Sequence, residues 1–165
     1  LKALGATVIG TVGTEEKAAL AKAHGCDHVI LYEREDVVKR VRELTGGRGV
    51  PVVYDSVGKA TFAASLDCLR LRGTLVSFGN ASGPVPPFDI GVLAAKGSLR
   101  LTRPTLFSYV RDRPTLEAMA ADLFARVING SVRIEVNQRY PLADAAQAHR
   151  DLESRRTTGS TVLVV

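Results

Sequence analysis

Gly13, Thr14 and Lys17 form the first group in the sequence whose residue types and spacing indicate chemistry. They lie in VGTEEK, directly after the apolar segment ATVIGT. Thr14 is a suitable helix N-cap, with Glu15 and Glu16 in the first helical turn. Lys17 then lies one turn into that helix. Two small neutral residues followed by a nearby cation favour the binding of a phosphate group at a helix start.

Short apolar segments alternate with amphipathic helical segments along the chain. The apolar segments are TVIGTV, HVIL, PVVYDSVG, TLVSFG, SLRLTR and TVLVV. Helical segments end at glycines just before the next apolar segment, at Gly5, Gly25, Gly46, Gly73, Gly97 and Gly159. This alternation predicts parallel strands joined by right-handed helical crossovers. We therefore expect an α/β fold with a doubly wound parallel sheet.

The carboxyl ends of parallel strands are where ligands bind in such sheets, so the residues there are the candidates for function. In a dinucleotide-binding unit, an acidic residue at the end of the second strand selects NAD, whereas neutral and basic residues select NADP. Gly13, Thr14 and Lys17 therefore favour a site that binds the 2′-phosphate of NADP. Glu15 and Glu16 argue for NAD, although acidic residues in a first helical turn are also ordinary partners of the helix dipole.

Two more groups follow predicted strands. Tyr32, in ILYERED, could stack on an adenine ring or donate its hydroxyl to the same phosphate, and an ordinary surface tyrosine explains it equally well. In VVYDSVG, Asp55 and Ser56 are either ligand-binding residues or caps of a helix that begins at Lys59. Capping is the favoured role for Asp55.

The segment VSFGNASG ends another predicted strand. Gly79 lets the backbone approach a ligand closely, and Phe78 and Asn80 could line a nicotinamide ring. A simple turn is the alternative interpretation of these residues.

The chain carries no familiar catalytic motif. It has no G-x-S-x-G nucleophile elbow and no H-E-x-x-H zinc motif. Hydride transfer needs neither, because a nicotinamide supplies that chemistry and the protein supplies orientation.

The composition limits which other classes of protein the chain can belong to. The chain has 165 residues, of which 45% are hydrophobic and 24% charged, which is typical of a globular protein. Its net charge of +5 comes from dispersed basic residues beside acidic ones, which favours a solvated surface over a nucleic-acid site.

No apolar run reaches the roughly 20 residues of a membrane span. Cys26 and Cys68 form no disulfide framework, so we expect a reducing cytoplasm and no zinc site.

The alternation of strands and helices changes near residue 103. The next segment predicts a long helix with one apolar face, made by Leu116, Met119, Leu123, Val127 and Ile128. A strand-like VRIEV, a helix with Asp144 near its start and a closing strand STVLVV follow. This tail either packs on the sheet or belongs to a second domain.

At this point the sequence resembles a known family. The segments KALGATVIGTVGTEEK, VVYDSVGKATFAASLDCLRLRGTLVSFGNASG and KGSLRLTRPTL are similar to the zinc-independent quinone oxidoreductases of the medium-chain dehydrogenase/reductase superfamily, the ζ-crystallin-like NADPH:quinone reductases. The resemblance continues to the closing segment AHRDLESRRTTGSTVLVV. It implies NADPH as the cofactor, a quinone as the substrate and no catalytic side chain.

The resemblance also implies which residues bind the cofactor. Those beside the adenosine ribose and its 2′-phosphate would be Gly13, Thr14, Lys17, Tyr32, Ser56 and Val57. Those beside the nicotinamide would be Phe78, Gly79, Asn80, Ala81, Pro104, Thr105 and Leu106. Arg155, in ESRRTTG, would close over the cofactor from the tail.

Members of this family carry a GroES-like substrate domain, a central strand and a glycine-rich phosphate loop before a segment like KALGA. The resemblance implies that residues 1–103 are part of a Rossmann-like NADPH-binding domain and that residues 104–165 return to the substrate domain. Without the glycine loop, which binds the pyrophosphate, we expect the chain alone to bind NADPH weakly and not to reduce quinones.

Other interpretations stay open. The chain resembles other zinc-independent relatives too, such as enoyl reductases, and a non-catalytic dimerisation or RNA-binding module is a further alternative. Family members dimerise through an edge strand, which implies a homodimer formed near Ser98 to Arg103.

Overall fold

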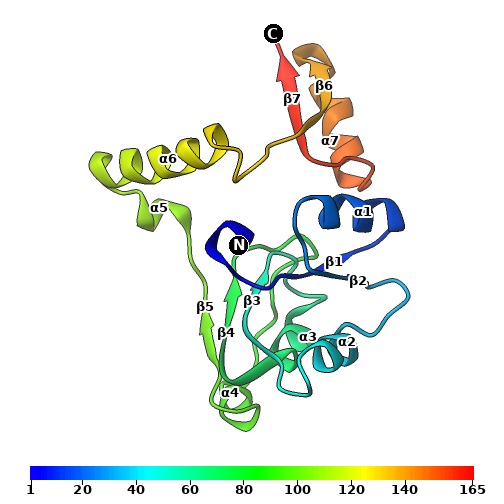
Figure 1. Ribbon diagram of the computed structural model, residues 1–165, viewed down its shortest axis with the longest axis vertical. Coiled ribbons are helices and arrows are strands. Elements are labelled where there is room, and N and C mark those ends of the chain that lie inside the picture. Colours follow the sequence, from blue (N-terminus) through cyan, green and yellow to red (C-terminus); the bar gives the residue numbers. More distant parts are fainter. The chain divides into compact units, whose positions relative to one another are not determined.

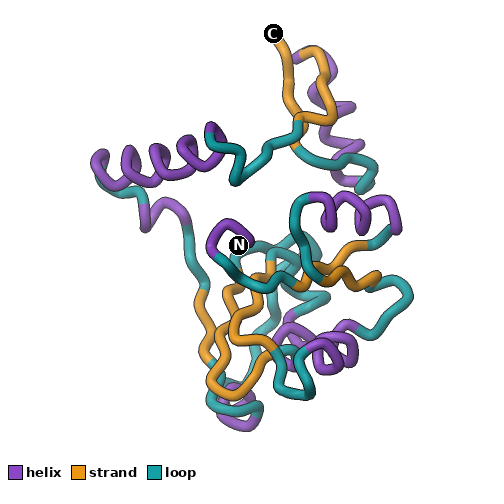
Figure 2. Tube along the Cα trace, viewed as in Figure 1, coloured by secondary structure: helices purple, strands orange, loops and turns teal.

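The computed structural model describes all residues, 1–165, and divides them into two compact units. One unit is formed by Thr7–Leu116, and the other by Leu1–Ala6 together with Glu117–Val165. Figure 1 labels the elements and Figure 2 traces the helices and strands along the chain. No helix has the length and apolar character needed to cross a membrane.

The unit formed by residues 7–116 alternates strands and helices. Its elements are β1 (Ile9–Val12), α1 (Glu15–Ala23), β2 (His28–Leu31), α2 (Val37–Leu44), β3 (Val50–Asp55), α3 (Phe62–Asp67), β4 (Leu69–Ser77), α4 (Gly91–Ala95), β5 (Arg100–Thr102) and α5 (Leu106–Tyr109). Every strand pair in this unit is parallel. The predicted α/β class is therefore confirmed.

The strands form two sheets rather than one continuous sheet. β1 pairs with β2, and β3, β4 and β5 form a second sheet in that order. β1 and β3 do not pair with each other. In Figure 1, α1 lies on one side of β1 and β2 and α2 lies on the other, which is the doubly wound arrangement.

Two apolar clusters form the core of this unit. One contains Leu66, Leu69, Leu75 and Leu99 and lies around the β3–β4–β5 sheet. The other contains Ile30, Val41 and Cys68, with Ile9 of β1 and Val53 of β3 packed against it. Because this second cluster draws residues from both sheets, it holds them together without a shared strand. Burial of Cys68 raises the pKa of its thiol to about 11, so this thiol stays protonated and part of the core.

Most of the predicted glycine turns are confirmed. Gly5, Gly25, Gly46, Gly97 and Gly159 all have positive φ. Gly73 was wrongly expected to precede a strand, because it lies inside β4 and Arg72 has the positive φ of 58° instead. A Cβ at Gly73 would lie 2.9 Å from the Arg70 carbonyl oxygen, so glycine is needed there for close packing.

The other unit carries the tail of the chain. Its elements are η1 (Lys2–Leu4), most of α6 (Arg113–Ile128), β6 (Val136–Pro141), η2 (Leu142–Asp144), α7 (Ala145–Glu153) and β7 (Ser160–Val164). β6 and β7 are parallel. On the predicted apolar face of α6, Met119 and Leu123 remain 45% and 46% exposed, so that face is not covered within the unit.

The strand expected at VRIEV is wrong except for its last residue. The amide of Val132 donates to the Arg126 carbonyl oxygen at 3.0 Å, with Gly130 at a φ of 77° between them. This closure of the α6 carboxyl terminus occupies the residues that were expected to begin a strand. Pairing starts only at Val136, where Ser160 of β7 becomes its partner.

Candidate nucleotide-binding site

The ends of β1 and β2 bring Gly13 and Tyr32 together. β1 and β2 are in register from Ile9 opposite His28 to Val12 opposite Leu31. The Tyr32 amide donates to the Val12 carbonyl oxygen at 3.1 Å, which continues the pairing by one residue. A Cβ at Gly13 would lie 2.8 Å from the Tyr32 hydroxyl oxygen. Glycine at position 13 therefore makes room for that hydroxyl.

Thr14 and Lys17 join this group through the start of α1. The Thr14 hydroxyl oxygen accepts a hydrogen bond from the Lys17 amide at 3.3 Å, which confirms Thr14 as the N-cap. The half-buried Lys17 side chain leaves the first turn of the helix. We call Gly13, Thr14, Lys17 and Tyr32 the phosphate cluster. An ammonium group, a phenol hydroxyl and the positive end of a helix dipole are together suited to an anion.

The loops after β3 and β4 form a second group. The Phe78 amide donates to the Asp55 carbonyl oxygen at 2.8 Å, and the Ala81 amide donates to the Ser56 carbonyl oxygen at 3.1 Å. The Ser82 amide donates to the Val57 carbonyl oxygen at 2.8 Å. These bonds join the two loops side by side. The structure thus brings together Ser56, Val57, Phe78, Gly79, Asn80 and Ala81, which were predicted as cofactor-binding residues.

Gly79 allows the closest approach between these loops. A Cβ there would overlap the Ser56 carbonyl oxygen and lie 2.8 Å from the Ser56 Cα. Real Cβ atoms essentially never approach another heavy atom closer than 3.0 Å. Glycine at position 79 is therefore required by the neighbouring backbone.

A buried carboxylate holds the loop after β3. Asp55 is 4% exposed and accepts hydrogen bonds from the Val57 and Gly58 amides and from the Thr61 and Ser65 hydroxyls. Burial alone would raise the pKa of Asp55, but these hydrogen bonds to the charged form outweigh it and lower the pKa. Asp55 is thus ionised and holds the loop after β3. The predicted capping of a helix by Asp55 is wrong, because its amide partners, Val57 and Gly58, precede α3 and the N-cap of that helix is Thr61.

The helix expected from Lys59 begins later. The Thr61 amide donates to the Gly58 carbonyl oxygen at 3.0 Å, which makes a turn before the helix. α3 then starts at Phe62 with Thr61 as its N-cap residue. The turn forms because Asp55 already binds the Thr61 hydroxyl and draws this segment back toward the strand end.

Arg103 is a residue of the site that the sequence interpretation missed. Its Nη1 donates to the Ser77 carbonyl oxygen at 3.0 Å and to the Gly79 carbonyl oxygen at 3.1 Å. It therefore binds the backbone on both sides of Phe78. The only signal for this role was the position of Arg103 directly after β5. Because Thr102 of β5 lies opposite Val76 of β4, the next residues, Arg103 and Ser77, are neighbours.

A pocket of about 580 Å³ lies beside these loops, and it is lined mostly by apolar side chains. Its lining residues are Phe62, Ser77, Asn80, Pro84, Val85, Pro86, Pro87, Phe88, Leu101 and Arg103. The rings of Phe62 and Phe88 lie 4.9 Å apart at a tilt of 55°. The proline-rich loop GPVPPFD, residues 83–89, therefore forms one wall of this pocket.

The remaining predicted residues lie farther along the chain. Pro104, Thr105 and Leu106 directly follow β5, the neighbour of β4, and Leu106 is 64% exposed. Arg155 lies in the other compact unit and has a φ of 60°, and the neighbouring Arg156 pairs with Asp151 at 3.0 Å. The closure of Arg155 over a cofactor stays a prediction. No group of three or more His, Cys, Asp or Glu side chains gathers where it could hold a metal ion.

Comparison with known proteins gives a consistent family. Residues 1–125 match the model of the family described as zinc-binding dehydrogenase. The chain is 58% identical over 163 residues to a quinone oxidoreductase of Pseudomonas aeruginosa, covering 99% of this chain and 50% of that protein. It is 48% identical over 165 residues to a 2-haloacrylate reductase of a Burkholderia species, covering 98% of this chain and 49% of that protein.

Among solved structures, the chain is similar to the quinone oxidoreductase of Escherichia coli complexed with NADPH. The TM-score is 0.96 at 50% sequence identity, over 99% of this chain and 51% of that chain. The chain thus spans about half the length of these relatives and corresponds to their carboxyl-terminal, Rossmann-like half. It belongs to the zinc-binding dehydrogenase family.

Proposed function

We propose that this chain is the nucleotide-binding half of an NADPH-dependent quinone oxidoreductase. The observation that carries the proposal is the phosphate cluster at the ends of β1 and β2, in a chain whose fold matches a relative complexed with NADPH. The cluster contains the side chains of Lys17 and Tyr32, and the neighbouring Glu15 carboxylate is paired with Arg34. This donor set fits a 2′-phosphate better than a 2′-hydroxyl.

The two joined loops serve the other end of the cofactor. When bound, a reduced nicotinamide supplies the hydride for a quinone, and the protein holds it in position. The backbone of residues 78–81 lies at the carboxyl end of β4, and Phe78 is 51% exposed. We assign to Phe78, Gly79, Asn80 and Ala81 the orientation of the nicotinamide face, joined by Pro104, Thr105 and Leu106 after β5.

Lys17→Ala tests the proposed function. The experiment uses the chain placed behind the amino-terminal half of the Pseudomonas aeruginosa relative, which we call the completed protein. Calorimetric titration of the completed protein should show NADPH binding that weakens about tenfold in Lys17→Ala, with little change in NADH binding. Equal binding of both cofactors, unaffected by the substitution, would contradict the 2′-phosphate site.

The same completed protein tests the reaction. We expect oxidation of NADPH when 1,4-benzoquinone is added, followed by the loss of absorbance of the reduced nicotinamide. The similarity to a 2-haloacrylate reductase supports a second candidate, reduction of an alkene conjugated to a carboxylate. A completed protein that oxidises NADPH with 2-chloroacrylate and not with the quinone would favour that candidate.

We also propose that two copies associate through β5. This strand lies at the edge of its sheet with β4 on one side only, so its other edge can extend the sheet across a two-fold axis. Light scattering of the completed protein at concentrations on the order of tens of micromolar should give the mass of a dimer. A monomeric mass under those conditions would contradict this assembly.

Two further assignments remain proposals of ours. The unpaired thiols of Cys26 and Cys68 support a location in a reducing compartment such as the cytoplasm. The return of residues 104–165 to a GroES-like substrate domain is supported by the uncovered apolar face of α6.

A further inference from the structure

An ion pair lies directly beside the phosphate cluster. Glu15 is the first residue of α1 and follows Thr14. Its Oε1 lies 3.2 Å from Nη1 of Arg34, in the loop after β2. Neither residue belongs to the cofactor-binding set expected from the family resemblance.

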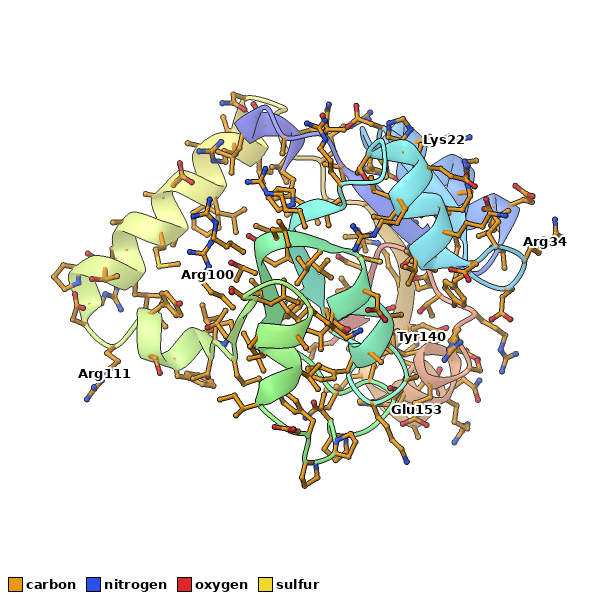
Figure 3. The ribbon with its side chains drawn as sticks, turned by 90° about the horizontal axis from the view of Figure 1, so that it is seen from below. Lys22, Arg34, Arg100, Arg111, Tyr140 and Glu153 are labelled. Carbon is orange, nitrogen blue, oxygen red and sulfur yellow. The ribbon has the colours of Figure 1, made fainter.

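The turn after β2 carries Arg34 back toward the start of α1. The amides of Arg34 and Glu35 both donate to the Leu31 carbonyl oxygen at 2.9 Å, so the chain reverses immediately after the strand. Arg34 is two residues after Tyr32, whose hydroxyl lies over Gly13. Figure 3 shows Arg34 projecting outward from this loop. The cation is therefore at the same strand ends as the phosphate cluster.

The ion pair between Arg34 and Glu15 is weak, so Arg34 can exchange its carboxylate partner for another anion. Their side chains are 72% and 68% exposed, and ion pairs in water are weak at such exposure. By contrast, Arg40 is held between Glu35, at 3.0 Å, and Glu43. Arg34 pairs with the Glu15 carboxylate and is otherwise largely exposed to solvent, so it can turn to an arriving anion at little cost.

Glu15 would oppose the binding of a phosphate if it were left alone. Its carboxylate stands one residue from the N-cap, where the 2′-phosphate is expected, and like charges at such range repel. Arg34 cancels that charge and offers a planar fork of donors, which suits phosphate oxygens.

We propose that Arg34 determines the preference of this chain for NADPH over NADH: it neutralises Glu15 before the cofactor binds, and it contacts the 2′-phosphate afterwards. This inference rests on the proposed function. NADH carries a hydroxyl in place of the 2′-phosphate, so it gains little from Arg34.

The test is calorimetric titration of the completed protein with NADPH and with NADH. Arg34→Ala should weaken NADPH binding about five- to tenfold and leave NADH binding within about twofold. Glu15→Gln should strengthen NADPH binding about two- to threefold, because the repelling charge is removed. Arg48→Ala is the matched control, since Arg48 is an exposed arginine that precedes β3, at the opposite end of the strands.

The outcomes separate this inference from the proposed function. If Arg34→Ala and Arg48→Ala change NADPH binding equally, or if Arg34→Ala weakens both cofactors equally, the role of Arg34 is overturned. The proposed function stands even if the role of Arg34 is overturned, provided that the unsubstituted protein prefers NADPH and that Lys17→Ala removes this preference. If the unsubstituted protein shows no preference for NADPH, both the proposed function and this inference are overturned.

Discussion

Asp55→Ala should lower the free energy of unfolding of this chain by about 3 kcal/mol, because four donors, two of them buried and two half-buried, lose a charged acceptor. The amides of Val57 and Gly58 would be left without a partner in the loop that contacts Gly79. Asp55→Asn keeps the shape of the side chain and loses its charge, so its effect should be smaller. Urea unfolding followed by circular dichroism measures both variants.

The role of Asp55 also predicts a dependence on pH. Its pKa is lowered in the folded state, so the folded protein holds this proton less tightly than the unfolded chain does. The resulting stability is fully present above the unfolded pKa of about 3.9 and is lost as pH falls through the folded value. Between pH 7 and pH 3, the unsubstituted chain should therefore lose more stability than Asp55→Asn does.

Asp89→Asn is the matched control for these measurements. Asp89 is exposed and accepts one hydrogen bond, from the Gly91 amide at 2.8 Å. Its substitution should change stability by less than about 1 kcal/mol. If Asp55→Asn were as stable as Asp89→Asn at neutral pH, the buried carboxylate would not hold the loop.

Gly79→Ala should separate the two loops of the nicotinamide side. The added Cβ would overlap the Ser56 carbonyl oxygen, and neither atom belongs to a flexible side chain that could move away. Because backbone must shift, we expect a loss of about 2 kcal/mol in the free energy of unfolding. In the completed protein, NADPH binding should weaken at least about tenfold, because the residues that hold the nicotinamide are displaced.

Gly91→Ala provides the comparison. A Cβ at Gly91 would lie 3.2 Å from a carboxylate oxygen of Asp89, which is the end of a side chain that can turn. That variant should bind NADPH normally. Normal binding by Gly79→Ala as well would show that the close contact of the loops is not needed for the cofactor.

Much of the nucleotide-binding unit follows from local sequence patterns. The segment HVIL predicted β2 from His28 to Leu31, and the N-cap role of Thr14 followed from its place before two glutamates. These features depend on residues within a few positions of one another, so strand propensity and capping chemistry suffice to predict them. The same reasoning failed at VRIEV, where closure of the α6 terminus competes with strand formation.

Family resemblance and local patterns together predicted the residues of the candidate site, but not the residues that hold them in place. Phe78 to Asn80 were predicted at the end of a strand, whereas Arg103, which binds the backbone around Phe78, was missed. Its contact with Ser77 spans 26 positions in the sequence. Such a contact forms only when β4 and β5 are adjacent and in one particular register.

The sequence by itself thus determined the alternation of strands and helices, the carboxyl ends that carry Gly13, Tyr32 and Phe78, and the cationic character near Lys17. Only the tertiary structure decided that the strands form two separate sheets and that Gly79 lies against Ser56. It also placed Arg34 against Glu15, 19 positions earlier. The physical reason is that periodicity and capping act within one element, whereas these contacts depend on strand order, register and side-chain reach between elements.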